Sequence, residues 1–304
     1  MPEGPEVHTI VDEIKSKIVG RSLISIEWDN ESKYHKGLSN YEDLCNYLPM
    51  TITDVFAHGK QIFMILYRSY RVQDEDHEKK FYINITLGME GKIDWVPSSH
   101  SNLWMNISTD NFIDEIIIID DILYFDDSRH FGNVFILDQC QYEIKLKSIG
   151  PDLLTSEITE EEWFGKARNK RISNKQICDY LMEQKYFSGI GNYLKAEILY
   201  ASRVKPDRIM SDLSDEDLRN LLHWSKNKIT ESYLSNGLTS QSSDCQGSGL
   251  KDQVPIRSYR SPEGKLGTFE RVVYGKKFDP LGNPVVQSKF KDGRTTHWVP
   301  NLQV

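Results

Sequence analysis

The spacing of apolar residues changes near Ile149-Gly150-Pro151, and this change limits how the chain can fold more than any other feature. Before it, short apolar or alternating runs between Gly, Asp, Asn and Ser clusters predict strands of a sandwich or barrel at 62–67, 81–87, 116–119 and 134–137. After it, apolar residues recur at helical spacing over 159–168, 175–183, 193–201 and 215–234. Strands and helices that are segregated in this way indicate an α+β chain of more than one domain.

The two ends of the chain add a leading helix and a small β-structure. Residues 5–18 predict an amphipathic helix, because five apolar side chains recur at helical spacing: Val7, Ile10, Val11, Ile14 and Ile18. Residues 269–304 return to hairpin-like strands, with turns predicted at 279–283 and 292–293. We therefore expect domains at 1–148, 149–240 and 241–304.

Composition excludes several classes of protein. No apolar run approaches the ~20 residues of a membrane helix, and the first ten residues lack the basic and apolar regions of a signal peptide. We therefore expect a soluble intracellular protein with no membrane partner. The four cysteines lie far apart without a CxxC pair, which argues against a disulfide scaffold and a cysteine zinc site.

The formal net charge of −8 lowers the expectation of a nucleic-acid partner, because DNA affinity depends on Lys and Arg. The charge is unevenly distributed, however. Residues 245–304 hold ten basic and five acidic groups, a net +5, so the rest of the chain carries −13. Segregated charge of this kind can form a positive groove on an acidic protein, although a bare charge run is more often a solvated face.

The N-terminus holds the clearest candidates for chemistry. Removal of Met1 would make Pro2 a free secondary amine, which can attack an electrophilic carbon and form an iminium. Glu3 and Glu6 are three residues apart and can share one side of the first helical turn, where a carboxyl group could protonate a leaving or ring oxygen. Taken alone, the pattern is more typical of an ordinary helix start.

Three turns add further candidates. The glycines of 188–193 permit a tight turn with positive φ, after which Asn192 begins a helix whose N-terminus favours an anion such as a phosphate. Lys60 is expected at the tip of a turn between two strands. Arg129 and Phe131 share one loop and could enter a base stack, whereas the ordinary interpretation is a surface arginine and a core phenylalanine.

The order of these motifs resembles the formamidopyrimidine-DNA glycosylase and endonuclease VIII family of base-excision repair. The resemblance spans nearly the whole chain through Pro-Glu-Gly-Pro-Glu at 2–6, Gly-Lys at 59–60, Leu-Gly-Met-Glu-Gly at 87–91, 127–132, Ile-Gly-Pro-Asp at 149–152, 184–192 and Val-Tyr-Gly-Lys at 273–276. It implies a two-layered β-sandwich with a leading helix, then a helix-two-turn-helix domain with a β-hairpin finger. It also implies damaged DNA, duplex or single-stranded, as the partner of a monomer.

The resemblance assigns roles to individual residues. It implies that Pro2 is the nucleophile on C1′ of the damaged nucleotide, that Glu3 is the general acid at the sugar and that Glu6 supports the catalytic site. Lys60, Asn192 and Arg294 would hold the phosphates that flank the lesion, and Lys60 is also expected to belong to the catalytic set. Met89, Arg129 and Phe131 would fill the gap left by the everted nucleotide, since the glycosidic bond is unreachable within the stack. The resulting Schiff base would make the C2′ protons of the sugar acidic, so that β- and then δ-elimination would break the strand.

The C-terminal part of the chain departs from the family pattern at the zinc-binding finger. Most relatives bind zinc in the finger through four cysteines, whereas Val299 and Leu302 stand where the last CxxC would be, so we expect a zincless finger and no cofactor. Apolar packing of Trp298 and Val299 would replace the metal. Arg257 and Tyr259 lie where relatives close over the flipped base and are candidate lesion contacts.

The sequence is compatible with two classes of lesion, one for each branch of the family. A glycine at position 4 is similar to the pattern of the endonuclease VIII branch, which implies oxidised pyrimidines such as thymine glycol and also hydantoins. The Met-Arg-Phe set instead resembles the formamidopyrimidine branch. A non-catalytic DNA-binding protein and a metal-dependent nuclease are the competing classes. Richness in Asn, Ile, Lys and Asp is compatible with the AT-rich genome of a large DNA virus, and location would follow the DNA, in a nucleus or a cytoplasmic replication site.

Overall fold

The structure is a computed structural model that describes residues 2–73, 75–109, 112–113, 116–238 and 261–304. It divides into two compact units, each of which is described by itself. The N-terminal unit holds Pro2, Val7–Ser148 and Ser261–Gly264. The C-terminal unit holds Glu3–Glu6, Lys265–Val304 and the described part of Ile149–Arg260.

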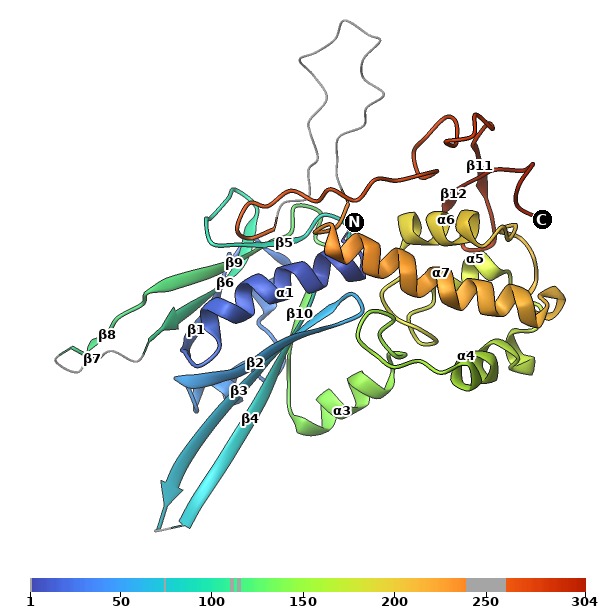
Figure 1. The fold of residues 1–304 in the computed structure, drawn as a ribbon. Coiled ribbons are helices and arrows are strands. Elements are labelled where there is room, and N and C mark those ends of the chain that lie inside the picture. The colour runs from blue at the N-terminus through green and yellow to red at the C-terminus, as the bar shows by residue number, and fades with distance from the viewer. Residues whose placement is uncertain (1, 74, 110–111, 114–115, 239–260) are drawn as a thin grey trace, which may run out of the picture. The chain divides into compact units, whose positions relative to one another are not determined.

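An eight-stranded antiparallel sheet forms the N-terminal unit, in the order β10-β4-β3-β2-β1-β6-β9-β5 (Figure 1). Its strands are β1 (Ser22–Trp28), β2 (Met50–His58), β3 (Gln61–Val72), β4 (Glu75–Thr86), β5 (Lys92–Asp94), β6 (Ser101–Ser108), β9 (Asp121–Asp126) and β10 (Asn133–Leu137). The pairing between β1 and β2 is limited to Ser22–Thr51 and Leu23–Met50. The sheet therefore consists of two four-stranded halves joined over two residue pairs, which is the two-layered sandwich that was predicted.

The leading helix and the strands agree largely with the hydrophobic pattern. Helix α1 (Gly4–Ile18) buries all five predicted apolar side chains to 3% exposure or less. The predicted strand at 116–119 is shorter than expected, because β8 (Ile116–Ile117) pairs only with β7 (Phe112–Ile113) in a separate two-stranded ladder. The unit also holds the short helices η1 (Lys33–Lys36), α2 (Tyr41–Cys45) and α3 (Gln139–Lys147).

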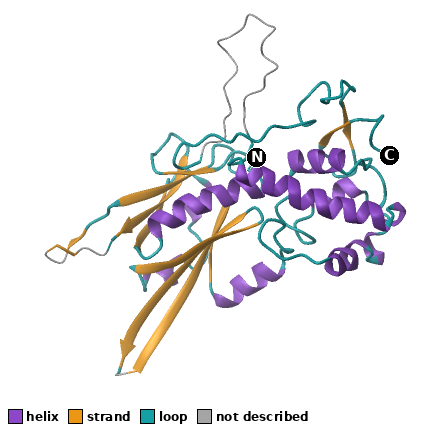
Figure 2. Cartoon of the chain, in the orientation of Figure 1, coloured by secondary structure: helices purple, strands orange, loops and turns teal. Residues whose placement is uncertain are grey.

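Helices dominate the C-terminal unit, as Figure 2 shows. They are α4 (Glu160–Ala167), η2 (Lys170–Ile172), α5 (Ile177–Met182), α6 (Asn192–Ala201), η3 (Met210–Asp212) and α7 (Asp215–Leu234). Helix α7 begins with a capping box between Ser214 and Asp217. The core between the helices includes the fully buried Trp163 and Tyr180. No helix of the described residues is long and apolar enough to cross a membrane.

A hairpin of β11 (Val286–Lys289) and β12 (Thr295–Trp298) completes this unit. It contains the predicted turn at 292–293, and a second predicted turn is held by Asp279, whose carboxylate accepts the N–H groups of Leu281 and Asn283. Val299, at the end of the hairpin, is fully buried and clusters with Ala196 and Val273.

Candidate active site

The Glu3 carboxylate lies at the N-terminus of α6 within the C-terminal unit. It accepts the N–H groups of Gly191 at 2.6 Å, Tyr193 at 2.9 Å and Leu194 at 3.3 Å, and Glu3 is only 2% exposed. The backbone donors and the helix dipole both favour the ionised carboxylate. A buried anion is therefore fixed at the residue that directly follows Pro2, which is itself buried.

Glu6 holds the same segment from the other end of the first helical turn. One of its oxygens accepts the N–H of Glu3 at 2.8 Å. The other accepts the Tyr193 hydroxyl at 2.9 Å and the N–H of Leu238 at 2.7 Å. Burial, with the Glu6 and Glu3 carboxylates, raises the pKa of Tyr193 well above its ordinary value, so the phenol keeps its proton and donates it. Glu6 thus links the backbone of Glu3 to Tyr193 and Leu238.

Two glycines allow this close approach for different reasons. Gly189 has φ +110°, as the sequence predicted for the turn, and its carbonyl accepts the N–H of Gly4 at 2.9 Å. Gly191 does not adopt positive φ. Instead, a Cβ at Gly191 would lie 2.1 Å from the Glu3 carboxyl carbon, so only glycine leaves room for the carboxylate.

The helix terminus that was predicted to bind a phosphate therefore holds an internal carboxylate. The expectation that its backbone N–H groups face a phosphate is wrong, because Glu3 already accepts three of them. The anion preference of a helix N-terminus was correctly predicted, but its occupant is 188 residues away in the sequence.

Asn192 and Arg294 come together on α6 and the finger. Asn192 is the first residue of α6, and its side-chain amide donates to the Thr295 carbonyl at 3.0 Å. An amide nitrogen carries two N–H donors, so one remains for a second acceptor. Arg294 is exposed on the turn that precedes β12, next to Thr295.

Lys60 occupies the expected turn in the N-terminal unit. Strand β2 ends at His58, β3 begins at Gln61, and Gly59 has φ +59°, so Lys60 lies at the tip of the hairpin. The position of this lysine agrees with the prediction.

The three candidate gap-filling residues lie on two loops of the N-terminal unit that contact each other. The Arg129 guanidinium lies over the Phe131 ring at 5.0 Å, and it pairs with Glu90, the neighbour of Met89, at 3.4 Å. Met89 is 41% exposed and Phe131 52%, so Phe131 does not pack in the core. A Cβ at Gly88 would lie 2.5 Å from the Phe131 backbone, which shows how closely the loops approach.

A buried carboxylate shapes the Phe131 loop, and the lysine that pairs with it was missed. Asp127 is fully buried and accepts the N–H groups of Phe131 at 3.2 Å and Gly132 at 2.8 Å. Lys33 pairs with Asp127 at 3.5 Å and donates to the His130 carbonyl at 3.1 Å. No local pattern marks Lys33, because its partners lie more than 90 residues away.

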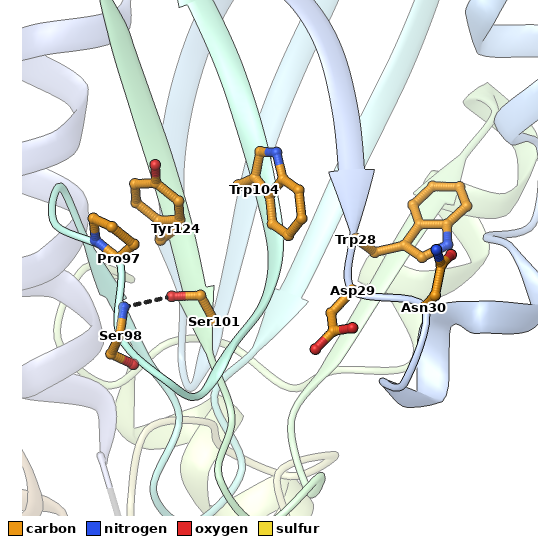
Figure 3. Close-up of a pocket in the computed structure, with 8 residues that line it drawn as sticks. All are labelled: Trp28, Asp29, Asn30, Pro97, Ser98, Ser101, Trp104 and Tyr124. Atoms are coloured by element: carbon orange, nitrogen blue, oxygen red, sulfur yellow. Dashed lines mark hydrogen bonds between the residues drawn. The ribbon is translucent and has the colours of Figure 1, made fainter.

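Arg257 and Tyr259, the candidate lesion contacts, lie outside the described residues. A hollow of about 520 Å³ in the N-terminal unit contains none of the predicted site residues (Figure 3). It is lined by Trp28, Asp29, Asn30, Pro97, Ser98, Ser101, Trp104 and Tyr124.

The residues of the finger do not fit the zinc that most relatives bind. Structural zinc takes four Cys or His ligands, whereas His297 is the one such side chain in the described hairpin and the residues beside it. Across the described ranges, no group of three or more His, Cys, Asp or Glu side chains could hold a metal ion. Burial, together with Arg271 and Lys195, lowers the pKa of His297.

Comparison with known proteins finds relatives along the chain. Three family models match: the formamidopyrimidine-DNA glycosylase N-terminal domain over 1–134, its H2TH domain over 149–244 and its C-terminal domain over 264–304. The formamidopyrimidine-DNA glycosylases of Legionella pneumophila and Carboxydothermus hydrogenoformans are each 27% identical over 100% of this chain, and cover 98% and 100% of their own lengths.

A solved structure shares the fold. The Lactococcus lactis enzyme in complex with DNA that contains an oxidised pyrimidine has a TM-score of 0.75 and 25% identity, with 99% of each chain covered. The buried first turn, the α6 terminus and the finger thus occur in a chain whose every domain matches one family. This chain belongs to the formamidopyrimidine-DNA glycosylase family, the DNA glycosylases of base-excision repair, whose partner is damaged DNA.

Proposed function

We propose that the chain is a bifunctional DNA glycosylase and AP lyase that uses Pro2 as its nucleophile. The observation that carries this proposal is the Glu3 carboxylate, fixed by three backbone N–H groups at the residue after Pro2. Family membership supplies the reaction class. After Met1 is removed, Pro2 presents a secondary amine, a nucleophile that needs no lysine side chain.

The chemistry follows from the amine and the carboxylate. The Pro2 nitrogen bonds to C1′ as the bond from C1′ to the base breaks, and the departing base takes up a proton from solvent. Glu3 accepts the proton that the Pro2 nitrogen loses and passes it to the ring oxygen, so that the C1′–O4′ bond opens and an iminium forms. Loss of a C2′ proton then expels the 3′ phosphate, and a second elimination expels the 5′ phosphate.

Glu6 and Tyr193 act on this chemistry indirectly. Glu6 accepts the Glu3 N–H and the Tyr193 hydroxyl, so it holds the backbone from which Glu3 and Pro2 extend. Ser232 contacts the same hydroxyl at 2.9 Å. We assign Glu6 as a positioning residue and reserve the catalytic roles for Pro2 and Glu3.

The DNA contacts divide into phosphate binding and gap filling. Lys60, Asn192 and Arg294 bind the phosphates that flank the lesion. Met89, Arg129 and Phe131 replace the everted nucleotide, and the exposure of Met89 and Phe131 beside Arg129 supports this role, because side chains that enter a base stack must be accessible. Eversion is needed because the duplex shields the glycosidic bond.

We propose oxidised pyrimidines such as thymine glycol, and hydantoins, as the bases removed by an endonuclease VIII-like specificity. Gly4 supports this choice, and the Lactococcus lactis enzyme has been crystallised with an oxidised pyrimidine in its DNA. The alternative is specificity for formamidopyrimidines and 8-oxoguanine, and the names of the curated relatives favour the formamidopyrimidines. We further propose that the finger holds its shape without zinc, through the buried Val299 cluster.

A panel of duplexes that each carry one lesion, analysed by mass spectrometry of the released bases and by strand cleavage in EDTA, tests this proposal. Release of thymine glycol and hydantoins with EDTA-resistant strand breaks is the expected result. Release of 8-oxoguanine alone would move the enzyme to the other branch. Binding without release would contradict the enzymatic function.

A further inference from the structure

A fully buried lysine on α6 pairs with the turn that carries Arg294. Lys195 is 0% exposed, and its ammonium forms an ion pair with Asp292, whose side chain is 3% exposed. Lys195 lies three residues after Asn192, so the two side chains extend from the same side of α6.

Asp292 uses its two oxygens for two different contacts. One pairs with Lys195, and the other accepts the N–H of Arg294 at 3.0 Å. On the other side of Arg294, the Thr295 carbonyl accepts the amide of Asn192 at 3.0 Å. The backbone of Arg294 is therefore held to α6 from both sides.

Stability alone does not explain a buried ion pair in this place. Removing two charges from water costs much of what their attraction returns, and apolar residues of similar size often serve a fold equally well. The described residues offer no metal-binding group that could fix the finger instead. What the charged pair supplies, and an apolar pair would not, is a directional link between α6 and a defined point of the turn.

We propose that Lys195 and Asp292 are positioning residues that hold Arg294 at the same phosphate as Asn192. The inference rests on the phosphate-binding role of Arg294 proposed above. Neither residue needs to touch DNA. Because the pair acts through Arg294, its removal should cancel the contribution of Arg294 to binding rather than add to that of other contacts.

The test is a double-mutant cycle in full-length protein on duplex DNA that carries a tetrahydrofuran abasic analogue. Wild type, Arg294→Ala, Lys195→Met/Asp292→Asn and the triple variant are compared by fluorescence anisotropy at several salt concentrations. The variant Lys195→Met/Asp292→Asn leaves no unpaired buried charge, because both side chains are then neutral. The amide oxygen introduced by Asp292→Asn can still accept the N–H of residue 294. Lys195→Met/Asp292→Leu serves as a second version if the first melts early.

We expect Arg294→Ala to weaken binding about tenfold, as for loss of one charged hydrogen bond, and to lower the salt slope by about 0.9. The Lys195/Asp292 variant should show the same losses, and Arg294→Ala should add nothing to them. Leu221→Ala, in the α7 core, is the control. It should lower the melting temperature, and Arg294→Ala should weaken binding in the Leu221→Ala background as much as it does in wild type.

Two results would overturn the inference, and they can be distinguished. If Arg294→Ala weakens binding equally with and without the ion pair, the pair does not position Arg294, while the proposed function stands. If Arg294→Ala has no effect in the wild-type protein, the phosphate role of Arg294 is wrong and the positioning role fails with it. Equal melting temperatures of the wild type and the Lys195/Asp292 variant would confirm that the cycle compares DNA binding rather than folding.

Discussion

The carboxylates of the first helical turn and the gap-filling loops are built in opposite ways. Glu3 and Glu6 are at most 2% exposed, and backbone N–H groups and a hydroxyl satisfy them. Met89 and Phe131, on two loops of the N-terminal unit, expose 41% and 52% of their surface. Groups assigned to chemistry are thus fixed by hydrogen bonds before DNA arrives, whereas groups assigned to DNA leave apolar surface uncovered.

This difference predicts which property each kind of substitution should change. Changes in the buried turn should reduce excision and leave DNA binding, because Glu3 is assigned to the reaction and both carboxylates are buried against protein donors. Changes on the exposed loops should weaken DNA binding with little effect on folding, because few protein contacts are lost.

The largest effect is expected at Glu3. Glu3→Gln removes the group that accepts and returns a proton, and it places an amide against three N–H donors. We expect single-turnover excision to fall at least about 100-fold, with DNA affinity by anisotropy nearly unchanged. Asp12→Asn, a change at an exposed acid of the same helix, is the matched control and should keep full activity. A Glu3→Gln variant of normal rate would remove Glu3 from the mechanism.

Glu6 should show a smaller, mixed effect. In Glu6→Gln one acceptor oxygen becomes an NH₂ group, which then opposes the Glu3 N–H or another of its present donors. We expect the free energy of unfolding to fall by about 1–3 kcal/mol, with excision reduced about 10- to 100-fold. Urea unfolding and single-turnover excision measure the two effects. Loss of stability at an unchanged rate would mean that Glu6 does not position Glu3.

Phe131 tests the exposed side of the comparison. Phe131→Ala should weaken binding to abasic duplex about 5- to 100-fold, since stacking on a base contributes about 1–3 kcal/mol, and stability should change by less than about 0.5 kcal/mol. Phe135, 40% exposed on β10, offers the matched control. If Phe135→Ala weakens DNA binding as much as Phe131→Ala, the gap-filling assignment is wrong.

The smallest effect concerns pH and the finger. Burial lowers the pKa of His297 below its ordinary value of 6.5. Below pH 6.5 the unfolded chain therefore takes up a proton that the folded chain resists, and stability falls as pH falls toward the folded pKa. The slope is at most about 1.4 kcal/mol per pH unit.

Thermal melts between pH 7.5 and 5 measure this effect. His297→Phe should flatten the curve below pH 6.5, whereas His223→Phe, a change at an exposed position of α7, should leave it as in wild type. Parallel curves for wild type and His297→Phe would contradict the assignment.

The sequence predicted those parts of the fold that depend on local spacing. Helix α1, helix α7, the Lys60 turn and the finger hairpin all follow from periodicity and turn residues. Helix α3 was missed because it buries no side chain and so has no apolar face to reveal it, although Asp138 and Gln141 form a capping box at its start.

The site itself depends on contacts that local spacing does not reveal. Glu3 meets Gly191, Lys33 meets Asp127 and Lys195 meets Asp292 across 94 to 188 residues. The order of motifs along the chain suggested the family, but not that Glu3 would occupy the helix terminus reserved for a phosphate. Long-range hydrogen bonds made by buried charged groups carry no periodic signal.

The most direct measurement of the central claim is the location of the covalent intermediate. Enzyme from which Met1 has been removed is mixed with abasic-site DNA and borohydride, and the digested adduct is analysed by mass spectrometry. The proposed function predicts that the reduced deoxyribose remnant is attached to the nitrogen of Pro2 and that a chain with a blocked N-terminus forms no adduct. A remnant on a lysine such as Lys60, or an adduct formed by the blocked chain, would contradict the assignment of Pro2.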